Sequence, residues 1–94
     1  MRPLFWTPES IQDREDIYDF IEADNPAAAL NLDELFSKKA LHLVDHPGLG
    51  RLGRVIGTRE LVVHPNKIWV YDVRGDRVRV LRLLHAASRW PPLA

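Results

Sequence analysis

The hydrophobic period of the sequence changes near residue 51, and this change constrains the fold more than any other feature. Before it, apolar residues recur every three or four positions, as they do on one face of a helix. After it, short runs of β-branched and aromatic residues alternate with turn-forming clusters. The junction, RLGRVIGTRELVV at 51–63, passes from three arginines and two glycines into an apolar run. Helices followed by strands indicate an α+β architecture.

Two helices are expected before the junction. Thr7 and Pro8 form a typical helix start, with threonine as the N-cap and proline at the first helical position. The first helix should end at Asn25, because a residue that precedes proline is disfavoured in the α region. Asn25 can then cap a second helix that runs to about 46–48. So short a break predicts an antiparallel helical hairpin that covers one face of a sheet.

The second half predicts a three- to four-stranded antiparallel sheet. Its expected strands are 55–56, 61–63, 68–71 and 78–84, separated by turn clusters at 57–58, 64–66 and 74–76. The apolar run at 4–6 is compatible with a further, first strand. Arg79 and Arg82 stand three apart and break strict alternation, which indicates a β-bulge or an edge position. A chain of 94 residues predicts one domain spanning 1–94.

The net charge of zero conceals an asymmetry between the two halves. Residues 1–50 carry ten acidic and four basic side chains, whereas residues 51–94 carry three acidic and nine basic ones. Either the basic half meets an anionic partner, or acidic residues decorate helix surfaces and basic residues decorate strands. The absence of cysteine excludes disulfides and thiolate chemistry. With no apolar run of ~18 residues and no secretory signal, we expect a cytoplasmic protein and no membrane partner.

Spacing alone reveals no strong chemical motif. His42 and His46 stand four apart on one expected helix face, a spacing that zinc sites use. No cysteine or acidic third ligand accompanies them, and histidines near a helix C-terminus are also favoured by the helix dipole. We therefore expect neither a metal nor a cofactor.

Several short motifs follow one another in a distinctive order: WTP at 6–8, NPAAA at 25–29, HP at 46–47, LGR at 49–51, GTRELVV at 57–63, VY at 70–71, LHAA at 84–87 and WP at 90–91. In this combination nearly the whole chain resembles the RelE/ParE superfamily of toxins from type II toxin–antitoxin modules. The resemblance implies two helices followed by an antiparallel sheet, as the hydrophobic pattern also predicts. It further implies a cognate antitoxin whose C-terminal segment is disordered alone and folds on the toxin. The chain shows no helix-turn-helix, so we expect no direct sequence-specific DNA binding.

Two activities divide this superfamily, and each implies a different role for the same residues. ParE-like members inhibit DNA gyrase, for which Arg54, Arg59, Arg89 and Trp90 are the expected target-binding residues. RelE-like members are ribosome-dependent mRNA endonucleases. A metal-independent endoribonuclease of that type needs cations for the phosphate and a group that acts as acid or base. The candidate cations are Arg54, Arg59 and Arg89, and the candidate acid or base is His85.

Two departures from the RelE-like pattern decide the order of these hypotheses. RelE-like enzymes carry an arginine where this chain has Ile68, and a C-terminal tyrosine where the tail offers only Trp90. We rank gyrase inhibition first, mRNA cleavage by a ribosome-dependent mRNA interferase second, and a degenerate toxin that only binds antitoxin third. Structural roles are the alternatives: a solvated or paired surface arginine at Arg59, a hydrogen-bonded histidine at His85 and a buried anchor at Trp90. Arg54, between two glycines, is expected to be exposed.

Overall fold

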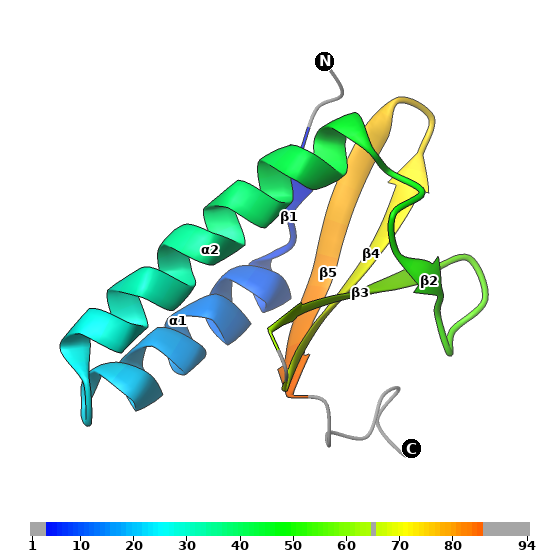
Figure 1. Cartoon of the computed structure of the whole chain (residues 1–94). Helices are drawn as coiled ribbons and strands as arrows, with labels where there is room; N and C mark the ends of the chain where they lie inside the picture. The colour runs from blue at the N-terminus through cyan, green and yellow to red at the C-terminus, as the bar shows by residue number, and fades with distance from the viewer. Residues whose placement is uncertain (1–3, 65, 86–94) are drawn as a thin grey trace.

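A helical hairpin covers one face of a five-stranded sheet in the computed structural model, which describes residues 4–64 and 66–85 (Figure 1). In chain order the elements are β1 (Leu4–Trp6), α1 (Pro8–Glu22), α2 (Pro26–Asp45), β2 (Arg51–Leu52), β3 (Arg59–His64), β4 (Lys67–Arg74) and β5 (Arg77–His85). The α+β class is confirmed, and both helices precede the four strands β2 to β5 as expected. Within the described residues, neither helix is long and apolar enough to cross a membrane.

Both helices begin at the predicted caps. The hydroxyl of Thr7 accepts a hydrogen bond from the N–H of Ser10 at 3.2 Å, and the side-chain oxygen of Asn25 accepts one from the N–H of Ala28 at 3.1 Å. Thr7 also joins α1 to the sheet, because its hydroxyl donates to the carbonyl of Leu81 at 2.9 Å. One side chain therefore fixes both the start of the helix and its position beside β5.

The prediction of three or four antiparallel strands is wrong in number and in one direction. The sheet has five strands in the order β1-β5-β4-β3-β2, and β1 runs parallel to β5 while the other pairs are antiparallel. The N–H of Thr7 continues the β1 pairing by donating to the carbonyl of Val80 at 3.1 Å. A strand this short has too few residues for a readable period, so its pairing depends on the edge that β5 leaves open.

The expected strand at 55–56 is also wrong, because that segment is a turn and the strand lies earlier, at Arg51–Leu52. The N–H of Gly53 donates to the carbonyl of Thr58 at 2.9 Å, and the N–H of Thr58 donates to the carbonyl of Val55 at 3.1 Å. These bonds close the chain into a compact loop. Gly57, with φ of +85°, supplies the left-handed conformation that the loop requires.

The predicted irregularity in the last strand is a β-bulge at Leu81. Val70 pairs with Arg82 and Tyr71 pairs with Val80, which leaves Leu81 as the extra residue on β5. The bulge brings Val80 and Leu83, three positions apart, onto the helix-covered face, where they are 0% and 3% exposed. The failure of strict alternation in the sequence is thereby explained.

The core lies between the helical hairpin and the central strands. Trp69 of β4 is fully buried, with its ring centroid 5.2 Å from that of Trp6 and 6.0 Å from that of Phe36. Arg14 of α1 ties the two helices together, because its Nε lies 2.6 Å from the Asp33 carboxylate of α2. These contacts fix the position of the hairpin on the sheet and so define the surfaces described next.

Candidate functional site

The two predicted arginines of the junction lie at the β2 edge of the sheet, but each has a different environment. The side chain of Arg54 is 44% exposed, as predicted, at the start of the β2–β3 loop. Arg59 is half-buried at the start of β3, and its Nη1 donates to the carbonyl of Gly50 at 2.7 Å. Arg59 is therefore committed to holding the α2–β2 connection as well as carrying a charge.

Glu60 is the residue at this edge whose role sequence reasoning missed. Its carboxylate is 2% exposed, accepts the backbone N–H of Arg54 at 2.9 Å and lies 3.4 Å from Arg51 Nη2 and 3.6 Å from Arg54 Nε. Neighbouring residues on a strand point to opposite faces, so Glu60 serves these two arginines and Arg59 points elsewhere. The alternation of side chains along β3 was the sequence signal that could have placed Glu60 and Arg59 on opposite faces.

Tyr71 of β4 fastens the chain between α2 and β2. Its hydroxyl donates to the carbonyl of Pro47 at 2.8 Å and accepts from the N–H of Gly50 at 2.8 Å. Burial raises the pKa of the Tyr71 phenol, while the Gly50 N–H and the Arg59 charge act in the opposite direction. A Cβ at Gly50 would meet the Tyr71 hydroxyl at 2.7 Å, so only glycine fits this approach.

His85 lies at the other end of the sheet from Arg59. It is exposed at the end of β5 and pairs with Lys67, whereas Arg59 pairs with Tyr71, four residues further along β4. This register separates the two backbones by about 13 Å along the strands and about 10 Å across two strand spacings. The proposed catalytic residues Arg59 and His85 are thus not brought together around one phosphate.

Three further positions were singled out in the sequence: Arg89, Trp90 and Ile68. Arg89 and Trp90 lie outside the described residues. Ile68, where RelE-like enzymes carry an arginine, is 6% exposed on β4, so this position is not open to a ligand in the present arrangement. The fold places Ile68 in a buried environment.

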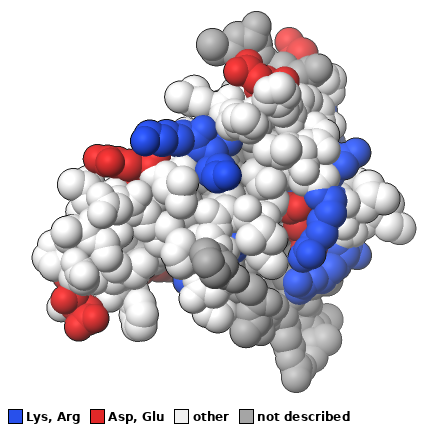
Figure 2. All heavy atoms as spheres, in the orientation of Figure 1, with Lys and Arg blue, Asp and Glu red and all other residues white. Residues whose placement is uncertain are grey.

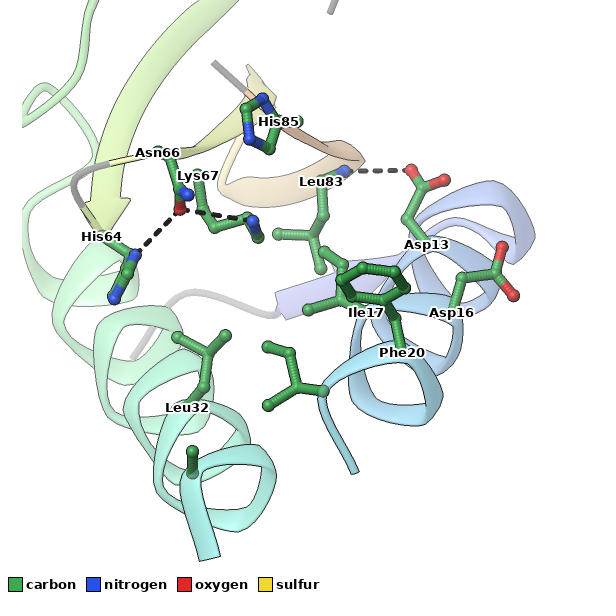
Figure 3. A pocket seen from close by; sticks show the side chains of 12 residues that line it. Asp13, Asp16, Ile17, Phe20, Leu32, His64, Asn66, Lys67, Leu83 and His85 are labelled. Carbon is green, nitrogen blue, oxygen red and sulfur yellow. Dashed lines mark hydrogen bonds between the residues drawn. The ribbon is translucent and has the colours of Figure 1, made fainter. Parts of the chain in front are cut away.

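A groove opens between the helical hairpin and the ends of β3, β4 and β5 (Figure 3). Its volume is about 660 Å³, and its lining is mainly apolar: Ile17, Phe20, Ile21, Ala28, Leu32 and Leu83. Phe20 is 81% exposed, which is unusual for so large an apolar side chain. These residues come from three separate elements, so their spacing in the sequence gave no sign of the groove.

The groove has carboxylates on its helix wall and an ammonium group with two imidazoles on its sheet wall. Asp13 and Asp16 come from α1, whereas His64, Lys67 and His85 come from the sheet (Figure 3). Burial lowers the pKa of the Lys67 ammonium, whose Nζ donates to Asn66 Oδ1 at 3.2 Å. Lys67 therefore gives the sheet wall a partly desolvated cation, which would pair with a carboxylate of a ligand.

Much of the positive charge of the second half is neutralised by carboxylates. Arg79 binds Asp72 through two hydrogen bonds of 2.8 and 2.6 Å, and Arg82 binds Asp13 of α1 through two of 2.6 and 3.0 Å. Each carboxylate raises the pKa of its arginine. Figure 2 shows Lys and Arg atoms gathered beside β2 around a small group of acidic atoms. The Arg82–Asp13 pair also joins the basic second half to the acidic first half.

The two histidines considered as metal ligands lie next to each other at the end of α2. The ring centroids of His42 and His46 are 4.8 Å apart. Among residues 4–64 and 66–85, no group of three or more histidine, cysteine, aspartate or glutamate side chains has the arrangement of a metal site.

Comparison with known proteins decides the family. The sequence profile described as "ParE toxin of type II toxin-antitoxin system, parDE" matches residues 4–90. The chain belongs to the ParE toxin family. It is 32% identical over 87 residues to a relative named as toxin Y4kP of Sinorhizobium fredii, covering 92% of this chain and 90% of the relative. It is 33% identical over 87 residues to toxin RelE2 of Caulobacter vibrioides, covering 93% and 98%.

The fold of this ParE-family chain also matches a solved structure. The chromosomal ParDE toxin–antitoxin system of P. aeruginosa contains a chain that superposes with a TM-score of 0.80 at 27% identity, covering 90% of this chain and 96% of that one. The superfamily resemblance is therefore confirmed. Family membership makes this chain the toxin component of a toxin–antitoxin module, whose counterpart is a cognate antitoxin.

Proposed function

We propose that this ParE-family toxin inhibits DNA gyrase by binding to it. The observation that carries the proposal is the dispersal of the catalytic candidates: Arg59 is bound to the Gly50 carbonyl, and His85 lies at the opposite end of the sheet. Cleavage at a phosphate requires an acid or base and the cations within a few ångströms of the same group. Binding to a protein surface makes no such demand.

A purified-component assay tests this proposal directly. The wild-type chain is added to gyrase and relaxed plasmid, and both supercoiling and enzyme-linked DNA breaks are measured with and without antitoxin. We expect dose-dependent inhibition that the antitoxin relieves. In cells, induction should produce DNA breaks and filamentation while mRNA stays intact. Unimpaired gyrase, together with early loss of translation, would contradict the proposal.

The antitoxin is proposed to place its folding segment in the groove between the hairpin and the strand ends. The apolar floor suits the apolar face of an amphipathic helix, as in other helix-in-groove interfaces. Acidic residues of the segment would face Lys67 and its neighbouring histidines, and basic ones would face Asp13 and Asp16. Coupled folding would then bury Phe20, which is largely exposed in the free toxin.

Substitution of Phe20 tests the groove. Phe20→Asp should weaken antitoxin binding by roughly 30-fold or more, the loss expected when a central aromatic anchor is removed. Ile11→Asp is the matched control, because Ile11 is 47% exposed on the same helix and does not line the groove. Isothermal titration with the purified antitoxin measures both. Equal affinities for the two variants would place the antitoxin elsewhere.

Ribosome-dependent mRNA cleavage is the alternative function. The relative named toxin RelE2 and the exposed position of His85 favour it. Under this alternative His85→Ala should lower the cleavage rate by about 100-fold or more, as loss of a general acid or base does. Under gyrase inhibition, the same variant should still inhibit supercoiling. Mapping mRNA ends after induction of wild type and of His85→Ala distinguishes mRNA cleavage from gyrase inhibition.

A further inference from the structure

The loop between β2 and β3, residues 53–58, presents an aliphatic side chain with no covering contacts. Ile56 at its tip is 100% exposed, and Leu52 on the preceding strand is 80% exposed. Single exposed apolar residues are ordinary on protein surfaces. Ile56 and Leu52 are not isolated in this way, because both add apolar surface to the same edge of the sheet.

The 53–58 loop is held rigidly by its own hydrogen bonds. In addition to the two backbone bonds that close it, the Thr58 hydroxyl donates to the carbonyl of Val55 at 2.7 Å. The N–H of Arg54 is fixed by the buried carboxylate of Glu60 at 2.9 Å. A Cβ at Gly53 would collide with the Thr58 Oγ1, so the close approach that shapes the loop requires glycine. An element already ordered loses little conformational entropy when it binds.

The charge around the loop restricts the kind of partner. Arg51 precedes the loop and Arg54 lies within it, with side chains 60% and 44% exposed, and both pair with the buried carboxylate of Glu60. Two arginines and one glutamate leave a single net positive charge on partly exposed side chains. An acidic rim on the partner would complement this charge, while the apolar tip would need an apolar recess.

A protein partner fits this surface better than a nucleic acid does. Single-stranded nucleic acids are bound by unneutralised cations together with aromatic side chains on which bases stack. The 53–58 loop contains no aromatic residue, and its tip is aliphatic. We propose that the 53–58 loop docks on the toxin's protein target, inserting Ile56 into an apolar recess rimmed by carboxylates. This inference rests on the proposed gyrase-binding function and names the element that makes the contact.

The loop and the groove are separate surfaces. The loop ends where β3 begins, and His64, at the other end of β3, lines the groove. The six residues of β3 place these two ends about 17 Å apart. A change at Ile56 should therefore affect target binding without altering the antitoxin's contact in the groove.

The test compares Ile56→Asp with Leu41→Asp. Leu41 is 63% exposed on α2 and takes no part in the loop or the groove, so it controls for adding a charge in place of an exposed aliphatic residue. We expect Ile56→Asp to raise the concentration for half-maximal gyrase inhibition by roughly 30-fold or more, as at a central interface anchor, and Leu41→Asp to leave it within about 2-fold. Both variants should bind antitoxin within about 3-fold of wild type.

Three outcomes would overturn the inference, and they differ from failure of the proposed function. Equal inhibition by wild type and Ile56→Asp would show that the loop does not dock while gyrase remains the target. Loss of antitoxin binding in Ile56→Asp would assign the loop to the antitoxin instead. Conversion of a wild-type dimer to a monomer by Ile56→Asp, measured by light scattering, would assign it to self-association. If wild type leaves gyrase active and cuts ribosome-bound mRNA, the proposed function fails first and the inference falls with it.

Discussion

Removal of one hydroxyl at Tyr71 should destabilise the toxin more than most single-atom changes do. The Tyr71 side chain is buried, and its hydroxyl satisfies both the Gly50 N–H and the Pro47 carbonyl. Tyr71→Phe loses two hydrogen bonds and leaves two backbone groups without this partner. At about 1–1.5 kcal/mol for each lost bond, the expected decrease in the free energy of unfolding is about 2–3 kcal/mol.

Thermal and urea unfolding measure this decrease. For a domain of this size the loss corresponds to a fall in Tm of roughly 10–20 °C. Tyr18→Phe is the control, because it makes the same chemical change at a site outside the buried core, and its unfolding midpoint should stay close to wild type. If Tyr71→Phe unfolds at the wild-type midpoint, water replaces the hydroxyl and the Tyr71 anchor contributes no stability.

The same anchor predicts a pH dependence with a definite sign. Burial raises the pKa of Tyr71 above its ordinary value of 10.0, so the folded state favours the neutral phenol. Its contribution is therefore fully present below pH 10 and is lost as the pH rises through the higher pKa of the folded state. Wild type should lose stability in this alkaline range, and Tyr71→Phe should lose less. Parallel pH profiles for the two chains would refute this reasoning.

Two further changes test the loop and the helix–sheet junction. Gly53→Ala should cost about 1–3 kcal/mol, because its Cβ would collide with Thr58 Oγ1 and lie 3.0 Å from the Thr58 carbonyl oxygen. Gly48→Ala is the control, because nothing lies within 4 Å of its Cβ, and it should unfold at a midpoint close to wild type. Asp13→Ala should cost about 2–3 kcal/mol, because the Leu83 N–H loses its acceptor at 3.0 Å together with the ion pair to β5. Urea unfolding checks both, and a loss below about 0.5 kcal/mol in either variant would contradict the corresponding geometry.

The helices could be predicted closely because their ends are set by local chemistry. Thr7 and Asn25 cap the helices through side-chain bonds to residues three positions later, and a proline follows each cap. Nothing distant is needed to read such a signal. The turn before the last strand is similar, since Gly75 has φ of +60° as its position in a tight turn requires.

The edge strands and the loop could not be predicted because burial there depends on distant partners. Val55 and Ile56 have the composition of a buried strand, yet Ile56 is fully exposed. β2 has only two residues and β1 only three, so neither contains a readable alternation. β1 exists because β5 has an open edge, and β5 lies more than seventy residues later in the sequence.

The sequence named individual candidate residues but not how the fold arranges them. The arginines near the junction were identified, and Arg54 is exposed as expected. Their binding partner Glu60 was not, because its role depends on which face of β3 each side chain occupies. The groove was missed altogether, since its walls come from helices and strands that only the tertiary fold brings together. Arg89 and Trp90 stay predictions.

The buried carboxylate of Glu60 bears on the choice between a phosphate and a protein surface. A phosphate at about 6 Å from this carboxylate would be repelled by about 3 kcal/mol at an effective dielectric constant near 20, which is similar to the attraction from one arginine at the same distance. Glu60 therefore cancels much of what Arg51 or Arg54 offers to a polyanion. The repulsion from Glu60 is small for a partner that presents scattered carboxylates and an apolar recess. Such a partner needs only the donors of Arg51 and Arg54 that Glu60 does not occupy. The position of Glu60 thus favours a protein over a polyanion at the β2 edge, as the proposed inhibition of gyrase by binding requires.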